Sequence, residues 1–595
     1  MAKRFILIML LLVPLCMAAE TVPPERAKRM AGNVLSAQGC WSRTLTQVVE
    51  QEALTKSVPS DPAYYIFKGD RGGFVITSAD DRLTPVLGWS ASGDIDGNDI
   101  PENLRSWLDM WSEALERIRS GIQLPQVGAR QEWESFEMGR IPTYATEKQY
   151  ETAKWNQDSP FNTYCPQVDG EPCAAGCTAV ATAIVMRYHE WPQAGCGVLP
   201  EYYYQDDDGT PRMVPELPLG NVYKWDAMPM VLHSYDDDEE AKEQVARLIA
   251  DVGIALQSEY NPGGTAAYTS DIVTALPHHF FYDASVVEYY LPYFTYGEWT
   301  GMLMDNLDKV GPLVYSGSSS RSGGHAFVVD GYNTKGQFSI NWGWGGSGNG
   351  FFTFPDFKDY KQYNTAVLGM KKDEGGTIKD HLFIDGNGVG SGLTSTTNEF
   401  KVGEPFSVSC LYVYNLSQYT FVGRFVLAVV HRDGSLGEVI DDGEGEEDAL
   451  FTIEPLRGGG IISEDCVLTE QPQIGDRICL FFRSENNPEL TLVTGNKENN
   501  TPYEIPIADA AYMDEVTSFR YTSSSGDLVI NTKKDAQWTV ADAAGTIYTE
   551  GIEFADGVLT IKTKEFPCGS YFITLYKGDD DRMSVEFVFG SKEVL

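Results

Sequence analysis

A run of small and apolar residues, Cys177 to Tyr188, contains no helix breaker before Trp191-Pro192. Because proline and the residue before it disfavour helical geometry, this run predicts a largely buried helix that ends there. Cys177 falls in its first turn. A second helix is predicted near Glu239 to Gln257.

Three apolar segments farther along the chain predict successive strands of one sheet. They are Pro312 to Tyr315, His325 to Asp330 and Gln337 to Asn341. A buried helix followed by antiparallel strands is typical of an α+β fold. We therefore expect an α+β domain over residues 146–377.

Residues 20–145 predict a smaller α/β unit in front of that domain. Its predicted elements are two strands and a helix: Ala63 to Phe67, Gly73 to Ile76 and Asn103 to Ile118. A polar connection, Gln131 to Glu151, follows and carries Arg140 and Lys148, which proteases can reach. A separate small fold placed before a larger domain, with a protease-accessible connection between them, suggests a pro-segment.

Beyond residue 378 the pattern changes to short alternating strands separated by turn residues. Residues 378–505 predict one immunoglobulin-like β-sandwich. A last all-β unit is predicted for residues 506–595.

The first residues have the pattern of a secretory signal peptide, with basic residues before the apolar segment Phe5 to Leu15 and small residues up to Ala19. We expect residues 1–19 to be removed and the protein to be secreted or held at the cell surface. Cys16 raises the alternative of a lipoprotein, but bulky Leu15 stands where lipoprotein processing usually requires a small residue. No later segment reaches the roughly 18 apolar residues of a membrane span.

The composition argues against two classes of function. The 595-residue chain has a formal net charge of −40, so phosphate repulsion opposes binding to nucleic acid. Its sequence contains no metal-ligand spacing such as Cys-x-x-Cys or His-Glu-x-x-His, and no phosphate-binding loop. No metal or nucleotide cofactor is therefore predicted.

Cys177 is a candidate nucleophile because it is predicted to start a helix. Unpaired backbone N–H groups and the helix dipole there stabilise a thiolate, which is the reactive form. Nine of the ten cysteines remain after removal of the signal peptide, and an odd number leaves one thiol free. Two structural roles stay open at this point, a buried apolar residue or half of a disulfide.

A cysteine nucleophile needs a base, and His325 is the best placed of the seven histidines. His189 lies on the same predicted helix, roughly 18 Å from Cys177 at about 1.5 Å per residue, which is too far. His325 begins a strand and follows Ser322-Gly323-Gly324, flexible residues that let a substrate approach closely.

Three further residues complete a candidate site. The strand after His325 ends at Asn341, which Trp342 follows, and either side chain could lie beside the imidazole. An amide there would fix the tautomer of the ring, and an indole would shield it from water. Gln157 is the right chemical type for an oxyanion donor. The 148-residue spacing from Cys177 to His325 matches papain-type enzymes, in which about 130–150 residues separate the two.

Five short motifs follow one another along the chain. They are Trp155-Asn-Gln157, Gly176-Cys-Thr-Ala-Val-Ala-Thr-Ala183, Tyr188-His-Glu-Trp-Pro192, Gly324-His-Ala-Phe-Val-Val-Asp-Gly331 and Asn341-Trp-Gly-Trp-Gly-Gly346. Together they closely resemble the streptopain family of secreted papain-like cysteine peptidases. The segment Gly72 to Ser90 is similar to the inhibitory pro-domain of that family. The resemblance spans about residues 22–375.

The resemblance implies an endopeptidase made as a zymogen, with protein and peptide substrates that carry an apolar side chain at the second position before the cut. The pro-domain would block the cleft as an intramolecular inhibitor until the chain is cut between residues 131 and 152. The implied roles are nucleophile for Cys177, general base and then acid for His325, oxyanion donor for Gln157, orienting wall for Asn341 and Trp342, and substrate contact for Ser322, Gly323 and Gly324.

Residues 378–595 depart from the short streptopain layout and resemble the appended modules of longer relatives. The last unit resembles the C-terminal sorting domains of a Gram-negative outer-membrane secretion pathway. Two other functions stay open. A transglutaminase-like acyl transferase is disfavoured by Gln157 and the Asn341 to Gly346 run, and a surface-binding protein with an inert peptidase domain is disfavoured by the intact Cys177 and His325.

Overall fold

The computed structural model divides the chain into two compact units, Met1–Ile100 with Trp111–Thr143, and Pro101–Met110 with Tyr144–Leu595. The described residues are 21–48, 62–97, 100–120, 126, 128–206, 208–319, 323–354, 364–385, 392–397, 400–431, 434–443, 450–473, 475–496 and 502–507, together with the strands between residues 516 and 589. The predicted signal peptide, residues 1–19, lies outside them. No helix in the described part of the chain is long and apolar enough to cross a membrane.

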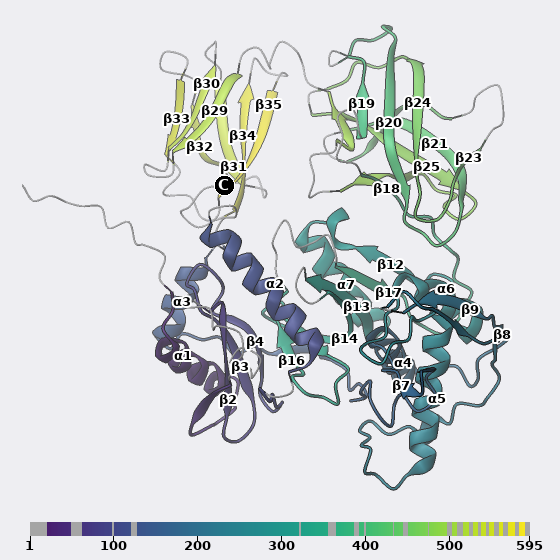
Figure 1. The fold of residues 1–595 in the computed structure, drawn as a ribbon. Coiled ribbons are helices and arrows are strands. Elements are labelled where there is room, and N and C mark those ends of the chain that lie inside the picture. Colours follow the sequence, from purple (N-terminus) through teal and green to yellow (C-terminus); the bar gives the residue numbers. More distant parts are fainter. Residues whose placement is uncertain are drawn as a thin grey trace, which may run out of the picture. The chain divides into compact units, whose positions relative to one another are not determined.

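The first unit is a small antiparallel sheet covered by helices (Figure 1). Its strands pair in the order β1 (Leu45–Val48), β2 (Tyr64–Gly69), β3 (Phe74–Ser78) and β4 (Val86–Ser90). Its helices are α1 (Pro24–Ala37), the second half of α2 (Glu102–Arg119) and α3 (Ala129–Glu137). The α/β character predicted for this region is confirmed.

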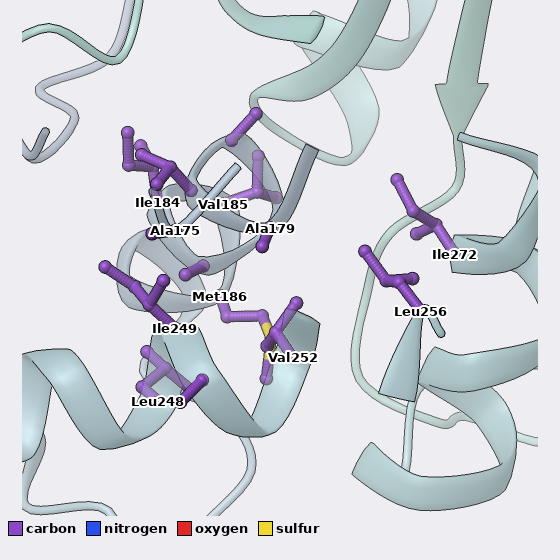
Figure 2. Close-up of a cluster of buried hydrophobic side chains, with 14 of the residues drawn as sticks. Ala175, Ala179, Ile184, Val185, Met186, Leu248, Ile249, Val252, Leu256 and Ile272 are labelled. Carbon is purple, nitrogen blue, oxygen red and sulfur yellow. The ribbon is translucent and has the colours of Figure 1, made fainter. Parts of the chain in front are cut away.

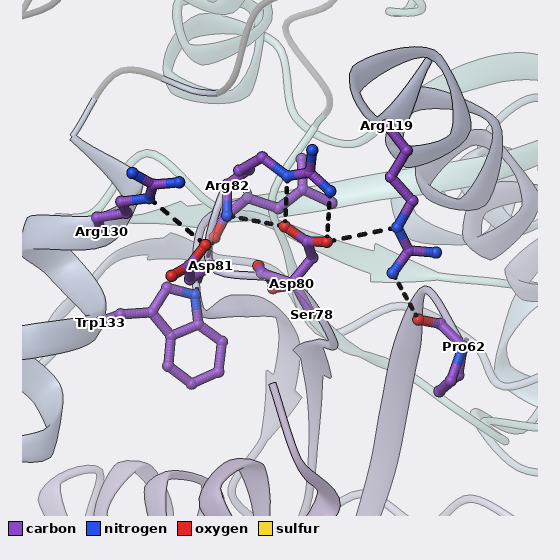
Figure 3. A network of polar contacts seen from close by, with 9 residues as sticks. Pro62, Ser78, Asp80, Asp81, Arg82, Arg119, Arg130 and Trp133 are labelled. Atoms are coloured by element: carbon purple, nitrogen blue, oxygen red, sulfur yellow. Dashed lines mark hydrogen bonds and ion pairs between the residues drawn. The ribbon is translucent and has the colours of Figure 1, made fainter. Parts of the chain in front are cut away.

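A buried carboxylate organises the loop between β3 and β4 (Figure 3). The side chain of Asp80 is 1% exposed and accepts two hydrogen bonds of 2.8 Å from the guanidinium of Arg82. The Nε atom of Arg119 lies 3.4 Å from the same carboxylate. Burial alone would raise the pKa of Asp80, but hydrogen bonds and charge from Arg82, with charge from Arg119, leave this pKa below its ordinary value. Asp80 therefore stabilises the unit as an ion.

Replacing Asp80 with asparagine is expected to destabilise the first unit by about 3 kcal/mol, because it leaves buried guanidinium charge without a counter-ion. Since the pKa of Asp80 is lowered on folding, its contribution is present at neutral pH and is lost as the pH falls below about 3.8. Hydrogen exchange of β3 and β4 measures the change. Asp94→Asn is the matched control, because the side chain of Asp94 is 70% exposed in its pair with Lys68. Equal exchange in the two variants would contradict the prediction.

In the second unit, a helical layer packs on an antiparallel sheet. The sheet order is β16 (Gly350–Phe352), β15 (Phe338–Asn341), β14 (Gly323–Asn333), β13 (Leu313–Ser319), β17 (Thr365–Leu368) and β12 (Val287–Tyr290). Helix α4 (Cys177–His189) contacts β13, β14 and α5 (Glu239–Ala255), while α6 (Ser270–Phe280) contacts α5 and β17. Helix α7 (Tyr296–Lys309) contacts β14 and β17. The predicted α+β fold is confirmed.

The core explains why α4 is apolar on nearly all sides. Its residues Thr178 to Met186 are all buried. Figure 2 shows Ile184, Val185 and Met186 gathered with Leu248, Ile249 and Val252 of α5 in one apolar cluster. At roughly 1.5–3 kcal/mol for each fully buried large aliphatic side chain, this packing fixes the helix that begins at Cys177.

The polar connection predicted from Gln131 to Glu151 is more structured than expected. Helix α3 extends to Glu137 because Trp133 and Phe136 are buried in the first unit. Strand β5 (Thr146–Gln149) pairs with the end of β14, although its side chains are mostly exposed. The segment between them, residues 138–145, lacks helix and strand.

Short hairpins and two strand-rich regions make up the remaining elements. The hairpins are β6 (Gln167–Val168) with β7 (Glu171–Pro172), β8 (Val198–Leu199) with β11 (Leu217–Pro218), and β9 (Tyr202–Gln205) with β10 (Pro211–Val214). The first region pairs β18 (Leu382–Ile384), β19 (Gly392–Ser395), β20 (Phe406–Asn415), β24 (Gly458–Cys466) and β27 (Thr494–Gly495) in one sheet, and β21 (Phe421–Val430), β22 (Leu436–Asp441), β23 (Phe451–Ile453), β25 (Arg477–Ser484), β26 (Thr491–Leu492) and β28 (Glu504–Pro506) in another. The two sheets share one apolar core, as expected for a β-sandwich.

The last region forms two more antiparallel sheets. One contains β29 (Val516–Thr522), β30 (Asp527–Thr532) and β33 (Val558–Lys562). The other contains β31 (Gln537–Asp542), β32 (Ile547–Gly551), β34 (Gly569–Tyr576) and β35 (Arg582–Phe589). Every element that the structure describes after residue 507 is a strand, so the strand-rich character expected of this region is confirmed.

Candidate active site

Cys177 is the first residue of α4, as the sequence predicts. Gly176 caps the helix with φ = 89°, and a Cβ atom there would lie 3.1 Å from Cγ2 of Thr265 and 3.2 Å from its carbonyl oxygen. The left-handed backbone and the close approach both favour glycine before the nucleophile. The thiol is half-buried. Helix packing and the glycine together hold it at a helix N-terminus.

His325 lies beside this thiol. Strand β14 carries His325 opposite Gly317 of β13, and the imidazole makes a hydrogen bond with the Cys177 side chain. The backbone N–H of Ala326 points to Sγ of Cys177 at 3.3 Å. Burial opposes ionisation of the thiol, but the hydrogen bond and charge of His325, helped by Ala326 and Thr178, lower the pKa of Cys177 below 9.0. The environment therefore favours a thiolate paired with an imidazolium.

Gln157 lies at the loop that leads to the nucleophile. The backbone carbonyl oxygen of Gln157 accepts a 2.9 Å hydrogen bond from the backbone N–H of Ala175, two residues before Cys177. Gly323 and Gly324 form the start of β14 and are both exposed, while Ser322 lies outside the described residues. The structure thus brings Gln157, Gly323 and Gly324 to the elements that carry the Cys177–His325 pair.

Asn341 and Trp342 form a buried wall behind these elements. Asn341 ends β15 in register with Val328, three residues beyond His325. Trp342 is 0% exposed, packs on Phe327 with ring centroids 4.9 Å apart, and donates its indole N–H to Gly348. The amide N–H groups of Asn341 are directed to Thr152 and Ala153.

The structure also places Asn103 at this site, which sequence reasoning missed. The amide of Asn103, in the first turn of α2, donates hydrogen bonds to the carbonyl oxygens of Ala326 at 2.6 Å and Trp342 at 3.0 Å. Its own oxygen accepts a 3.0 Å bond from the indole N–H of Trp344. These partners flank His325 and Asn341 directly. The sequence signal was a polar residue inside an apolar helical pattern.

Neighbouring residues of α2 extend this contact. Ser106 donates to the carbonyl oxygen of Gly323 at 3.3 Å, and the ring of Trp107 lies 6.5 Å from that of Trp342 and 5.0 Å from that of Phe352. The first half of α2 therefore lies over the strands that carry the candidate catalytic residues.

Three of the histidines that the sequence analysis set aside lie at the ends of helices. His189 ends α4, and burial lowers its pKa to about 4. His278 and His279 lie in the last turn of α6.

Within the described residues, no group of three or more His, Cys, Asp or Glu side chains is arranged to hold a metal ion. All eight cysteines that the structure describes are free thiols, which leaves Cys177 unpaired.

Two family models match the chain. Residues 155–352 match the peptidase C10 family, and residues 19–115 match the Spi protease inhibitor family. The first match contains Cys177, His325, Gln157, Asn341 and Trp342, and the second contains the first half of α2.

Curated relatives agree with these matches. The thiol protease/hemagglutinin PrtT of Porphyromonas gingivalis is 25% identical over 602 residues, covering 96% of this chain, and this chain spans 66% of that protein. Streptopain of Streptococcus pyogenes is 29% identical over 333 residues, covering 52% of this chain and 80% of streptopain.

Two solved structures of Prevotella intermedia proteins are also similar. A fragment of prointerpain A has 24% identity and a TM-score of 0.44, covering 56% of this chain and 100% of the fragment. Active interpain A, a cysteine protease, has 28% identity and a TM-score of 0.33, covering 38% of this chain and 95% of that structure. From the two family matches, residues 155–352 are a cysteine peptidase of the C10 (streptopain) family, preceded by a Spi-type inhibitor domain at residues 19–115.

Proposed function

We propose that the protein is an exported cysteine endopeptidase made as a zymogen, and that Cys177 and His325 carry out its chemistry. The observation that carries this proposal is the hydrogen-bonded pair at the start of α4, where the helix terminus, the imidazole and the Ala326 N–H all favour the thiolate.

The reaction follows from these groups. The Cys177 thiolate attacks the carbonyl carbon of the scissile peptide bond, and the oxygen gains negative charge. The N–H at the helix start and the side chain of Gln157 stabilise that charge. The His325 imidazolium gives its proton to the leaving amine, so the C–N bond breaks and an acyl-enzyme forms. The neutral imidazole then takes a proton from water, which attacks the thioester and releases the acid.

Inhibition by the chain's own pro-domain is supported by the contacts of α2. Asn103 donates hydrogen bonds to the carbonyl oxygens of Ala326, which follows His325, and of Trp342. Ser106 donates to the carbonyl oxygen of Gly323, at the proposed border of the substrate site. A peptide bound along β14 would compete for these same backbone groups. The contacts of α2 would therefore hold the uncut chain inactive.

The remaining parts of the proposal concern export and substrate. The apolar N-terminal segment, residues 1–19, is proposed as a cleaved signal peptide that leads to secretion or display at the cell surface. Proteins and peptides with an apolar side chain two positions before the cut are the proposed substrates. The β-rich residues 378–505 and 506–595 are proposed as an immunoglobulin-like module and a secretion sorting domain.

Casein hydrolysis by the processed chain, with and without iodoacetamide, tests the proposed function. We expect hydrolysis to stop when mass spectrometry shows one carboxamidomethyl group on Cys177. Hydrolysis that continues after Cys177 is fully alkylated would rule the assignment out.

We propose residues 138–143 as the processing site. Met138, Gly139, Arg140, Pro142 and Thr143 are exposed and Ile141 is half-buried, in a segment without helix or strand. Cleavage inside α3 or β5 would require unfolding of paired or buried residues, so both are disfavoured. We expect the N-terminus of the processed enzyme, read by mass spectrometry, to fall at or just after this segment.

A Cys177→Ala chain treated with trypsin provides the control for accessibility. Trypsin is expected to cut after exposed Arg140 before it cuts after Arg130 in α3 or Lys148 in β5, whose side chains pair with Asp81 and Asp308. A mature N-terminus beyond Thr152, or first cleavage after Lys148, would contradict the assignment of this segment.

A further inference from the structure

Hydrogen bonds link three buried polar side chains, those of Asp330, Thr152 and Asn341. The hydroxyl of Thr152 donates a 2.6 Å hydrogen bond to Oδ2 of Asp330, and it accepts a 3.0 Å bond from Nδ2 of Asn341. Asp330 and Thr152 are each 6% exposed and Asn341 is 1% exposed. A hydroxyl has one proton to donate, so its bond to Asp330 leaves only a lone pair for Asn341 and fixes the direction of both bonds.

These bonds determine the orientation of the Asn341 amide. Its second N–H donates to the carbonyl oxygen of Ala153 at 2.9 Å, and its oxygen accepts from the N–H of Gly343 at 3.1 Å. Both donors and the acceptor of the amide are therefore engaged, so a flipped amide would lose all three bonds. Because Gly343 directly follows Trp342, the same amide holds the loop that carries the indole.

Asp330 is a buried carboxylate, and such a group normally has hydrogen-bond partners for both of its oxygens. It lies on β14 five residues beyond His325, and its Oδ1 atom has no hydrogen-bond partner within normal distance in the described part of the chain. A buried carboxylate with an unpartnered oxygen is costly for folding. A role in fixing Thr152 accounts for its presence at this position.

Two residues of this network come from the segment that follows the processing region. Thr152 is one, and Gln149, whose amide donates to Ser339 Oγ at 3.2 Å, is the other. Burial raises the pKa of Asp330, and Ser339 is among the groups that oppose this rise. An enzyme cut at residues 138–143 would therefore keep strand β5 and Thr152. Strand β5 pairs with β14, and Thr152 accepts a hydrogen bond from Asn341.

We propose that Thr152 and Asp330 are positioning residues of the peptidase, which fix the Asn341 amide and the Trp342 loop against β14, the strand that carries His325. This inference rests on the proposed function and adds to it the role that the family resemblance implies for Asn341 and Trp342, that of a wall that orients the imidazole. Neither Thr152 nor Asp330 touches the reacting atoms; they act through Asn341.

Thr152→Val tests the inference, because valine keeps the shape of threonine and removes the hydroxyl. We expect kcat of the processed enzyme, per alkylatable Cys177 thiol, to fall on the order of 10- to 100-fold with KM within about 2-fold, as expected for misplaced catalytic groups. Thr152→Ser restores the hydroxyl and should restore kcat to within about 3-fold of wild type. Thr152→Ala replaces Thr152→Val if the valine variant does not accumulate as folded protein.

Thr269→Val is the matched control. The hydroxyl of Thr269 also donates to a buried carboxylate, that of Glu288, at 2.5 Å, but this pair is not linked to Asn341. The kcat of the Thr269→Val enzyme is expected to stay within about 2-fold of wild type. An unchanged kcat in Thr152→Val, or an equal loss in Thr152→Val and Thr269→Val, would overturn the inference. Full activity of Cys177→Ala would instead overturn the proposed function, so the two failures are distinguishable.

Discussion

Replacing Cys177 with alanine is expected to lower kcat/KM for a peptide substrate by about 10⁴-fold or more. The nucleophile forms the covalent intermediate, and the remaining groups supply only binding and charge stabilisation. We propose that the enzyme cuts its own chain at residues 138–143, so the Cys177→Ala chain should also stay at full length. Electrophoresis over time and a fluorogenic peptide assay measure the two effects.

A separate cut distinguishes lost catalysis from lost maturation. Trypsin cleavage in the 138–143 segment should produce a processed Cys177→Ala enzyme that is still inactive. Cys196→Ala, which removes another half-buried free thiol of the same unit, should keep activity within about 2-fold. Comparable activity of the processed Cys177→Ala and Cys196→Ala enzymes would show that Cys177 is not the nucleophile.

Replacing Asn103 with alanine is expected to speed self-processing by about 10- to 100-fold. The substitution leaves the carbonyl oxygens of Ala326 and Trp342 and the indole N–H of Trp344 without their partner. Each buried group left unpaired costs roughly 1–3 kcal/mol, and about 1.4 kcal/mol corresponds to a factor of ten in binding. In the proposed mechanism this contact holds only the uncut, inhibited chain, so its loss should favour the open state.

The half-time for conversion of full-length chain to processed enzyme measures this effect. Asn33→Ala, on the exposed face of α1, is the control for the loss of an asparagine side chain from the same region. The inhibitory role of Asn103 fails if the two variants convert at the same rate. Processed enzymes from both variants should have the wild-type kcat, because cleavage removes residues 20–143.

The catalytic pair could be predicted from sequence because its signals are local. The apolar run ending at Trp191-Pro192 defines α4, and the glycines before His325 together with the 148-residue spacing identify the histidine. The predicted helix start and the exclusion of His189 agree with the structure. The strand predicted from His325 to Asp330 exists, but it is longer at both ends, Gly323–Asn333, so His325 does not begin it.

Contacts between distant residues could not be predicted in this way. Asn103 and Ala326 are separated by 223 positions, and Asn341 and Thr152 by 189. Strand β5 has mostly exposed side chains, so no alternation of apolar and polar residues marks it as a strand. Its pairing depends on the backbone of β14, which the sequence of β5 does not reveal.

The pH dependence of Cys177 alkylation by iodoacetamide, in processed wild-type and His325→Ala enzymes, tests the central claim most directly. Because His325 lowers the pKa of Cys177 while burial raises it, the wild-type midpoint should lie below 9.0 and the His325→Ala midpoint should lie above the wild-type midpoint. Both enzymes are prepared by trypsin cleavage at the 138–143 segment, so that maturation does not differ. Coincident profiles would contradict the thiolate–imidazolium pair and, with it, the proposed catalytic site.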